Sequence, residues 1–271
     1  MDKVSFVILT WNSEKVILSC LESISTIREQ AVEIILVDNG SADGTVQVVN
    51  RFIAEHPDMT IRIICLEKNY GTTVSRNIGI KNISDDSNFV CILDSDTIIN
   101  AESVTELIAV IQSDPRNGIA GPHMVNLDGV EQVTAKCIPT AFLKFCKAFP
   151  LRAVQKIGER KEAYQFDGSQ RSYPVGYLIS ACWMIRREIL GKTGLLDENI
   201  FYSPEDVEFC VRVWNSGFRV LYCPNAKIIH ATQRISKKKL ISRHNWEHVK
   251  GLIYFFRKYG LFFSSGKIVC K

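Results

Sequence analysis

The chain has 271 residues, of which 46% are hydrophobic and 23% are charged, and its formal net charge is +4 at pH 7. This length and apolar content indicate a globular, enzyme-sized protein that can bury a sizeable core in one large domain or two small ones. The small net charge argues against nucleic-acid binding by the whole molecule, so we expect no nucleic-acid partner.

The first half of the chain alternates strand patterns with helix patterns. Short β-rich apolar runs predict strands over residues 4–10, 33–38, 60–66 and 89–94. Helical periodicity predicts a helix that Asn12 and Ser13 can cap, and further helices over residues 45–50, 74–80 and 102–112. Four strand–helix units in a row predict an α/β fold with a mostly parallel sheet and helices on both faces. In such sheets ligands bind beyond the carboxyl ends of the strands.

Three carboxylates stand where predicted strands end. Asp38 ends the second strand, Asp94 ends the fourth, and Asp96 projects on the same side of the extended chain as Asp94. Buried charges are costly unless they are paired, so these aspartates need a partner. An aspartate pair of this kind suits Mg²⁺ or Mn²⁺ that also contacts a substrate diphosphate. The pair alone is equally compatible with a solvated turn, but its place after an apolar strand favours the metal interpretation.

The second half is less regular. Residues 130–172 show no clear period and predict a variable, loop-rich segment. Regular structure returns over residues 173–186, followed by an acidic segment over residues 202–209. Apolar residues from Trp246 to Tyr259 predict an amphipathic helix, and residues 234–239 with Arg243 form a basic cluster. These two elements fit attachment to an anionic membrane surface, or a helix packed on the domain beside solvated lysines.

The cysteine pattern and the lengths of the apolar runs indicate where in the cell the protein is expected. Nine cysteines without a C-x-x-C pair are expected to be buried free thiols of a reducing compartment, with no disulfide frame or zinc site. No secretory signal precedes the first strand, and no apolar run approaches the roughly 20 residues of a membrane span. We therefore expect a cytoplasmic protein, with peripheral attachment to the inner face of the cell membrane as an open alternative.

Seven segments form a recognisable set, namely residues 7–12, 33–45, 69–71, 76–79, 93–96, 194–198 and 201–208. In this order and spacing they resemble the family 2 glycosyltransferases, which are nucleotide-sugar-dependent enzymes of the GT-A fold and include enzymes of bacterial surface-polysaccharide synthesis. The resemblance extends from Val4 to about His230. It implies a Rossmann-like, mostly parallel sheet with a mixed acceptor-side region. The expected divisions are a nucleotide-sugar-binding half (1–122), an acceptor-binding and catalytic half of the same domain (123–230), and a basic, amphipathic C-terminal extension (231–271).

The resemblance also implies roles for individual residues. The expected donor-binding residues are Thr10, Trp11, Asn12, Asp38, Ser41, Arg76, Asp94 and Ser95. Asp38 would accept a hydrogen bond from a uracil ring, which favours UDP, although thymine presents the same N–H and leaves dTDP-sugars such as dTDP-rhamnose open. Asp96, with Asp94 and His230, would hold a divalent cation, Mn²⁺ or Mg²⁺.

On the acceptor side, the resemblance makes Asp206 the general base of an inverting single displacement. It has Glu205 bind acceptor or donor hydroxyls and places Trp183 beside the acceptor. The expected acceptor is a saccharide or a lipid-linked saccharide.

Purely structural interpretations stand beside these roles. Asp38 can cap a loop, Arg76 can be a surface cation, and Trp11 can be a core aromatic residue. Residues 205–208 can be an acidic helix start that the helix dipole favours, and His230 can be a structural residue.

Other functions are also open. A haloacid dehalogenase-type phosphatase also uses D-x-D, but Ile98 stands where its motif has threonine. A nucleotidyltransferase needs a glycine-rich, lysine-bearing loop that residues 10–14 lack. A non-catalytic nucleotide-sugar or carbohydrate-binding module is the third alternative.

Overall fold

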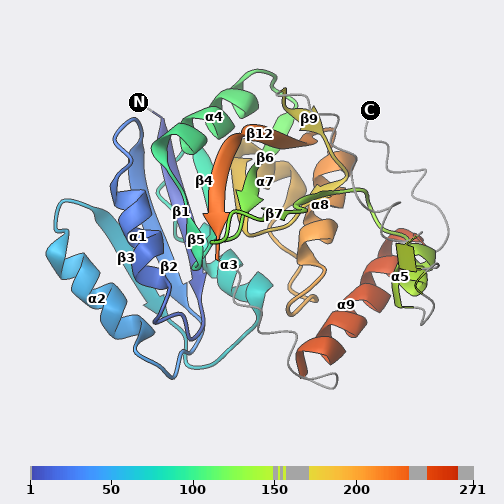
Figure 1. The fold of residues 1–271 in the computed structure, drawn as a ribbon, viewed down its shortest axis with the longest axis horizontal. Helices are drawn as coiled ribbons and strands as arrows, with labels where there is room; N and C mark the ends of the chain where they lie inside the picture. Colours follow the sequence, from blue (N-terminus) through green and yellow to red (C-terminus); the bar gives the residue numbers. More distant parts are fainter. Residues whose placement is uncertain (1, 149–151, 153–154, 157–170, 232–242, 262–271) are drawn as a thin grey trace.

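A central mixed sheet with helices on both faces forms the body of the protein (Figure 1). The computed structural model describes residues 2–148, 152, 155–156, 171–231 and 243–261. Four parallel strands begin the sheet in the order β3-β2-β1-β4. Their bounds are β1 Lys3–Thr10, β2 Ala31–Asp38, β3 Thr60–Cys65 and β4 Phe89–Asp94. The four predicted strands are thus confirmed.

The four predicted helices of the first half are also present. They are α1 Ile17–Ser25, α2 Thr45–Glu55, α3 Thr72–Lys81 and α4 Ala101–Gln112. The first helix begins later than the sequence predicts and has no side-chain cap. Ser13 instead contacts two other segments of the chain. Its backbone N–H donates to Thr45 Oγ1, and its hydroxyl lies 2.9 Å from that of Ser95.

The second half extends the same sheet. From β4 the order continues β11-β6-β12-β5, with bounds β5 Thr97–Ile98, β6 Asn117–Val125, β11 Cys182–Arg186 and β12 Arg219–His230. Strand β11 is antiparallel to both of its neighbours, and β12 is parallel to β6. The expected division between residues 122 and 123 therefore falls inside β6, and both halves share one sheet.

Short elements complete the described part of the chain. The remaining strands are β7 Glu131–Gln132, β8 Ala135–Lys136, β9 Tyr173–Pro174 and β10 Tyr177–Leu178. The remaining helices are α5 Ala141–Ala148, the 3₁₀ turn η1 Arg187–Ile189, α7 Leu190–Thr193, α8 Glu205–Asn215 and α9 Arg243–Tyr259. The segment expected to be loop-rich thus contains short strands and one helix where the structure describes it.

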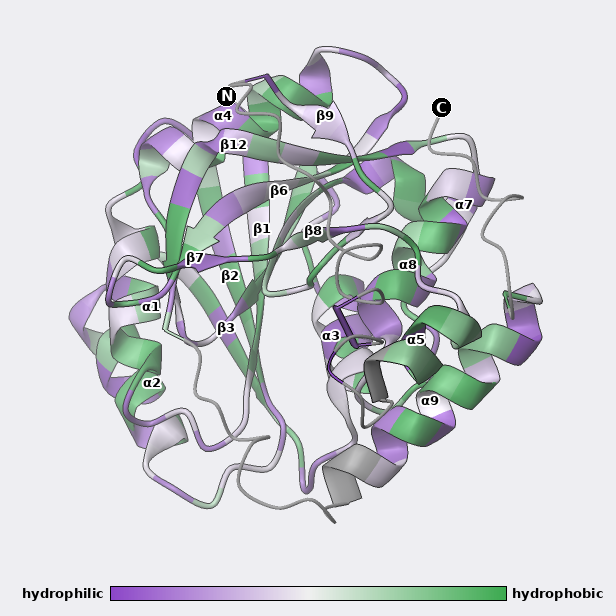
Figure 2. Ribbon diagram, turned by 45° about the vertical axis from the view of Figure 1, so that its right-hand side comes forward, coloured by the Kyte–Doolittle hydropathy of each residue, from purple (hydrophilic) through white to green (hydrophobic). Residues whose placement is uncertain are grey.

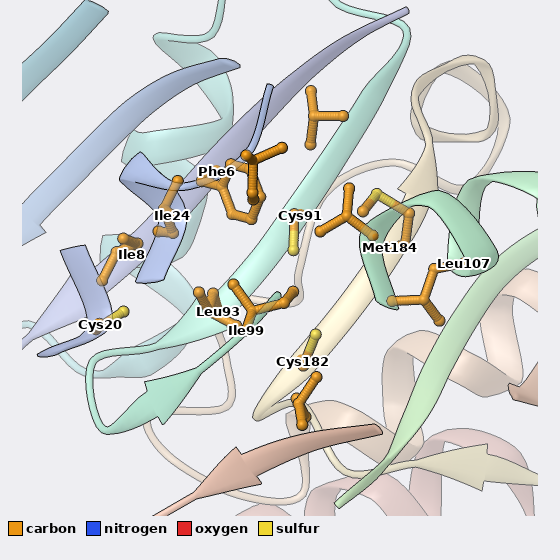
Figure 3. Packing of buried hydrophobic residues seen from close by; sticks show 14 of the residues in the cluster. Phe6, Ile8, Cys20, Ile24, Cys91, Leu93, Ile99, Leu107, Cys182 and Met184 are labelled. Atoms are coloured by element: carbon orange, nitrogen blue, oxygen red, sulfur yellow. The ribbon is translucent and has the colours of Figure 1, made fainter. Parts of the chain in front are cut away.

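Alternation along the strands fills two apolar layers, one on each face of the sheet. Phe6, Ile8, Cys91 and Leu93 point toward α1, α2 and α4, and Figure 3 shows this layer from close by. Val7 and Ile92 point to the opposite face, which α3, α8 and α9 cover. Because both faces are covered, the central strands are apolar at almost every position. Figure 2 shows the complementary pattern on the helices, where α2 and α9 carry alternating hydrophobic and hydrophilic stripes.

Helix α9 packs on the domain with one apolar face. Phe255 and Phe256 are buried in the second apolar layer, whereas Trp246, Val249 and Ile253 are exposed. The basic run over residues 234–239 lies outside the described residues, as do the side chain of Arg243 and its surroundings. Among the residues that the structure describes, no helix has both the length and the apolar character needed to cross a membrane.

The eight cysteines within the described ranges are all free thiols. Most are buried, as expected. Cys65 is exposed, which corrects the expectation for that residue. The reason is its place on β3, the edge strand of the sheet, where the layers cover less of the strand.

Candidate active site

A cleft with a volume of about 350 Å³ opens beyond the carboxyl ends of β1 and β4, where the strand rule predicts a ligand site. The start of α8 and the end of β12 close its other sides. Its lining residues are Leu9, Trp11, Ser13, Val16, Asn39, Asn69, Gly71, Thr72, Arg76, Asp94, Ser95, Asp96, Ile179, Ser180, Ala181, Phe201, Tyr202, Ser203, Glu205, Asp206 and His230.

Asp94, Asp96 and His230 form a candidate metal centre at one end of the cleft. One ligand atom from each residue lies within 4.8 Å of the others, and His230 Nε2 lies 3.3 Å from Asp96 Oδ1. Strand pairing produces this meeting: His230 pairs with Thr97, and the Ala231 N–H donates to the Asp96 carbonyl. Two carboxylates and one imidazole are suitable donors for Mn²⁺, so the residues present fit a divalent cation.

The two aspartates change the pKa of the His230 imidazole. Burial alone would lower the pKa of His230, but its hydrogen bond to Asp96 and the charges of Asp96 and Asp94 raise it above its ordinary value. A cation bound at this point would take over the role of the proton, because it would neutralise the same carboxylates.

Gln132 makes two hydrogen bonds to His230. Its Oε1 lies 2.9 Å from His230 Nδ1, and its Nε2 donates to the carbonyl oxygen of His230 at 2.8 Å. Because the amide oxygen only accepts, Nδ1 carries a proton. Nε2 faces Asp96, to which it donates when the imidazole is protonated, and it offers a lone pair to a cation when the imidazole is neutral. Sequence reasoning missed Gln132, because it lies in the irregular segment, and no local pattern connects it to a histidine 98 positions away.

Arg76 connects the two ends of the cleft. Its Nη2 donates to Asp94 Oδ1 at 2.7 Å and to the Ser180 carbonyl, and its Nη1 donates to Glu205 Oε1 at 3.2 Å. Only 3% of its side chain is exposed, so the interpretation of Arg76 as a surface cation is wrong. The resemblance placed Arg76 with Asp94 among the donor-binding residues, but it did not predict the contact of Arg76 with Glu205.

The R-N-x-G segment that carries Arg76 has a packing reason as well. Helix α3 lies so close to β1 that a Cβ on Gly79 would come within 2.4 Å of Val7 Cγ1. Asn77, two positions before Gly79, exchanges hydrogen bonds with the backbone of Leu196. These contacts fix α3, and with it the direction in which Arg76 points.

Glu205 and Asp206 stand at the start of α8, so the interpretation of this segment as an acidic helix start is confirmed and coexists with a place in the cleft. Glu205 accepts from the Ser180 hydroxyl at 2.8 Å and from Arg76. Burial and the charge of Asp206 raise the pKa of Glu205 to about 7 despite these two donors. Burial also raises the pKa of Asp206, against the opposing effects of the Val207 N–H and of the Lys136, Lys144 and Arg76 charges.

At the β1 end, Trp11 and Ser95 line the cleft, so Trp11 is more than a core aromatic residue. Four other expected donor residues, Thr10, Asn12, Asp38 and Ser41, are not among the lining residues. Asp38 is 2% exposed and accepts from the hydroxyls of Thr10 and Ser41 and from the Ser41 N–H. Asn12 lies in the left-handed region at φ 53°. Its backbone N–H donates to Ser41 Oγ, and its Oδ1 accepts from the Ala42 N–H. Asp38 therefore serves as a loop cap in this structure, as the structural alternative predicted.

Trp183 does not reach the cleft, and its expected acceptor contact is corrected here. It lies in β11 with no exposed surface, stacks on Phe209 at 5.7 Å between ring centroids, and donates its indole N–H to the Leu178 carbonyl. Alternation along β11 turns it into the apolar layer under α8. Ser180 and Ala181, shortly before Trp183 in the chain, do line the cleft.

Several lining residues had no role in the sequence analysis. Asn39 and Asn69 hydrogen-bond to each other across two loops, and the Thr72 N–H donates to the Phe201 carbonyl. Gly71 has φ 91°, and a Cβ there would meet Phe201 O at 2.3 Å, which explains the glycine of the N-Y-G segment. That glycine was the available signal that residues 69–71 closely approach another part of the chain.

Comparison with known proteins gives a consistent picture. The family model described as glycosyl transferase family 2 matches residues 5–194. The chain is 28% identical over 244 residues to an N-acetylglucosaminyl-diphospho-decaprenol L-rhamnosyltransferase of Mycobacterium tuberculosis, with 84% of this chain and 77% of the relative covered. It is 26% identical over 226 residues to the dTDP-rhamnosyl transferase RfbF of Shigella flexneri, with 83% of this chain and 68% of the relative covered.

Among solved structures, the chain is similar to the mannosyltransferase PcManGT of Pyrobaculum calidifontis in complex with GDP-Man and Mn²⁺. The TM-score is 0.65 at 17% identity, and the match covers 94% of this chain and 63% of that one. At this identity the likeness shows a common GT-A fold. The present chain thus spans less than two thirds of the length of that enzyme.

Proposed function

The chain belongs to glycosyl transferase family 2, and we propose that it transfers a sugar, with inversion, from a nucleoside diphosphate donor to a hydroxyl of a saccharide acceptor. One observation carries the proposal. The Asp94, Asp96 and His230 group lies in the same cleft as Asp206, and the buried Arg76 spans the distance from Asp94 to Glu205. This arrangement supports a site for a diphosphate and its cation in the same cleft as a carboxylate base, as a single displacement requires.

For the donor we propose a pyrimidine nucleotide, with dTDP-rhamnose to be tested ahead of UDP-sugars. The support comes from the two relatives described above, both named as rhamnosyltransferases and one named for dTDP-rhamnose. Trp11, Asn39 and Asn69 line the part of the cleft nearest β1 and are suited to contact a base and a ribose. The other expected donor residues would act indirectly, because hydrogen bonds among them stabilise the loop that carries Asn39. They are Thr10, Asn12, Asp38 and Ser41.

A divalent cation, Mn²⁺ or Mg²⁺, would be held by Asp94, Asp96 and His230. When bound, such an ion supplies positive charge that stabilises a departing diphosphate. The fit is supported by the donor set of this chain, and Mn²⁺ accompanies the nucleotide sugar in the similar mannosyltransferase.

Asp206 is the proposed general base. It would accept the proton of the acceptor hydroxyl while that oxygen bonds to the anomeric carbon and the bond from this carbon to the diphosphate oxygen breaks. The products are the inverted glycoside, a protonated Asp206 and the nucleoside diphosphate. Glu205 is held by Arg76 and Ser180, which suits it to orient hydroxyls and to position the neighbouring Asp206, not to exchange the reacting proton.

For the acceptor we propose a lipid-linked saccharide with a diphosphate. Lys136 and Lys144 come from β8 and α5, on the acceptor side, and their charges reach Asp206. These cations suit an anionic acceptor, and the relative from M. tuberculosis is named for an acceptor of this chemistry. Exposed apolar side chains on α5 and α9, namely Phe142, Phe145, Trp246, Val249 and Ile253, would face the membrane that carries the lipid.

Titration calorimetry with dTDP, UDP and GDP, with and without Mn²⁺, tests the donor site. We expect metal-dependent binding of one pyrimidine nucleotide by the wild type and its loss in Asp96→Ala. Asp128→Ala removes an exposed acid elsewhere and serves as the matched control. If no nucleotide binds under any condition, the proposal fails and a non-catalytic carbohydrate-binding module replaces it.

A further inference from the structure

Helix α9 makes ionic contacts, through Lys258, with two neighbouring segments. These segments are α8, which carries Asp206, and the loop that precedes α8. From these contacts we propose that Lys258 is a positioning residue for sugar transfer, which holds Asp206 and the loop over residues 195–204 in place from outside the cleft. The inference rests on the proposed function. It concerns a part of the chain that lies beyond the family match at residues 5–194.

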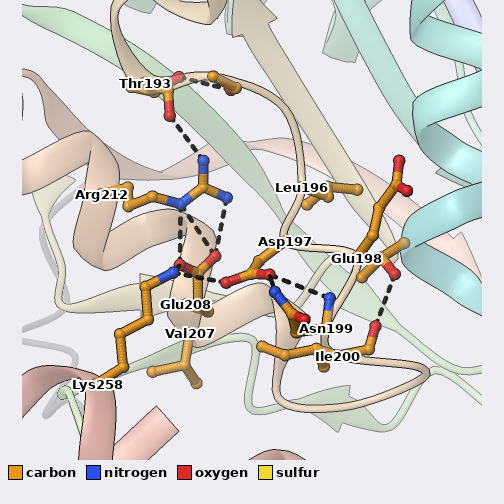
Figure 4. A network of polar contacts seen from close by, with 12 residues as sticks. Thr193, Leu196, Asp197, Glu198, Asn199, Ile200, Val207, Glu208, Arg212 and Lys258 are labelled. Carbon is orange, nitrogen blue, oxygen red and sulfur yellow. Dashed lines mark hydrogen bonds and ion pairs between the residues drawn. The ribbon is translucent and has the colours of Figure 1, made fainter. Parts of the chain in front are cut away.

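The first contact is with Glu208, two positions after Asp206 in the first turn of α8. Its side chain has no exposed surface. Lys258 Nζ donates to Glu208 Oε1 at 2.8 Å, and Arg212 donates to both Glu208 oxygens (Figure 4). The Tyr259 hydroxyl also donates to Glu208 Oε1, at 2.7 Å. A buried carboxylate is stable only when it is paired in this way. The start of α8 is thereby attached to α9.

The second contact is with Asp197, in the loop that precedes α8. Lys258 Nζ donates to Asp197 Oδ2 at 2.5 Å, and the Tyr254 hydroxyl donates to the same oxygen at 2.8 Å. Burial would lower the pKa of Lys258, but its hydrogen bonds to Asp197 and Glu208 raise it, so the ammonium stays charged. Figure 4 shows the lysine between the two carboxylates.

A third contact joins the same helix to the cleft wall. A Cβ on Gly251 would lie 2.2 Å from the Ser203 carbonyl oxygen, so the α9 backbone rests directly on the loop. Phe201, Tyr202 and Ser203 of this loop line the cleft. The loop is also held from the donor side, where the Thr73 hydroxyl donates to the Ile200 carbonyl at 2.6 Å. It is therefore fixed between α3 and α9.

These contacts assign Lys258 to positioning because neither Lys258 nor its partners Glu208 and Asp197 line the cleft. Glu208 belongs to α8, which carries the lining residue Asp206, and Asp197 belongs to the loop that carries the lining residues 201–203. A general base works only within hydrogen-bond reach of the proton that it accepts. A displacement of about 1 Å at a reacting group can reduce the rate by roughly 100-fold. Loss of Lys258 should therefore lower turnover more than donor affinity, because the metal group and the β1 end of the cleft lie on other elements.

The test compares Lys258→Met, Lys258→Arg and the control Lys250→Met, an exposed lysine on the same helix that pairs only locally with Glu247. Steady-state transfer gives kcat and the donor KM, and calorimetry gives nucleotide affinity. For Lys258→Met we expect kcat to fall about tenfold or more, with donor KM and nucleotide affinity within about twofold of wild type. Lys258→Arg should recover most of kcat, and Lys250→Met should leave it unchanged.

A second variant covers the case in which Lys258→Met fails to fold. Tyr259→Phe removes one hydroxyl from Glu208 but keeps the ring against Phe255, and it should lower kcat in the same selective way by a smaller factor. Equal kcat values for Tyr259→Phe, Lys250→Met and wild type would overturn the inference while leaving the proposed function in place. A wild-type chain that transfers no sugar would overturn both.

Discussion

The side chain of Gln132 makes two hydrogen bonds to His230: its Oε1 accepts from Nδ1 of the ring at 2.9 Å, and its Nε2 donates to the backbone carbonyl of the same residue at 2.8 Å. This pair leaves His230 Nε2 facing Asp96 at 3.3 Å. The metal affinity of the proposed site therefore depends on a residue that is not itself in the metal group.

Replacing Gln132 by leucine should weaken Mn²⁺ binding by roughly tenfold to 100-fold, because the imidazole loses the partner that fixes its tautomer and orientation. Calorimetric titration of Mn²⁺ measures the change directly, without turnover. Gln112→Leu, at an exposed position on α4, is the matched control. Equal Mn²⁺ affinities for the two variants would show that the ring needs no support from Gln132.

Asp206→Asn separates chemistry from binding. The amide keeps the size of the carboxylate but cannot accept the acceptor proton, so transfer should fall by roughly 100-fold or more while metal-dependent nucleotide binding persists. Radiolabelled transfer and calorimetry on the same sample measure the two quantities. Transfer at the wild-type rate would remove Asp206 as the base and would redirect attention to Glu205.

Glu205 makes stability depend on pH. Its pKa is raised from 4.5 to about 7 in the folded chain, so between these values the folded state retains a proton that the unfolded state has released. The free energy of unfolding should therefore fall as pH rises through this window. In Glu205→Gln this contribution disappears, and the decline should be smaller by on the order of 1 to 3 kcal/mol.

Urea unfolding of both chains at intervals from pH 4.5 to pH 8 measures this difference in slope. Glu55→Gln, at an exposed position on α2, should follow the wild-type curve. Parallel curves for Glu205→Gln and wild type would mean that Glu205 stays ionised throughout, held by Arg76.

Gly79→Ala tests the packing of α3 on β1. The added methyl group would meet Val7 Cγ1 at 2.4 Å, so we expect a loss of about 1 to 3 kcal/mol of unfolding free energy. Gly191→Ala is the matched control, because nothing lies within 4 Å of a Cβ there and alanine suits a helix better than glycine. Urea unfolding measures both, and equal stabilities would contradict the close contact.

The sequence by itself determined the first half of the fold and the place of Asp94 and Asp96. Apolar periodicity is a local property, set by which face of a strand or helix must be buried, and it fixed β1 to β4 and α1 to α4 to within a few residues. The position of Asp94 and Asp96 at a strand end followed from the same pattern, because parallel strands all end at one edge of the sheet.

The tertiary structure decided which distant side chains meet. The insertion of β11 between β4 and β6 turned Trp183 into the core, and the pairing of β12 with β5 brought His230 to Asp96. Gln132, Glu205 and Lys258 acquired their partners in the same way, across 98, 129 and 50 positions of chain respectively. Such contacts depend on strand order and helix packing, and the spacing of residues along the chain contains no local signal for either.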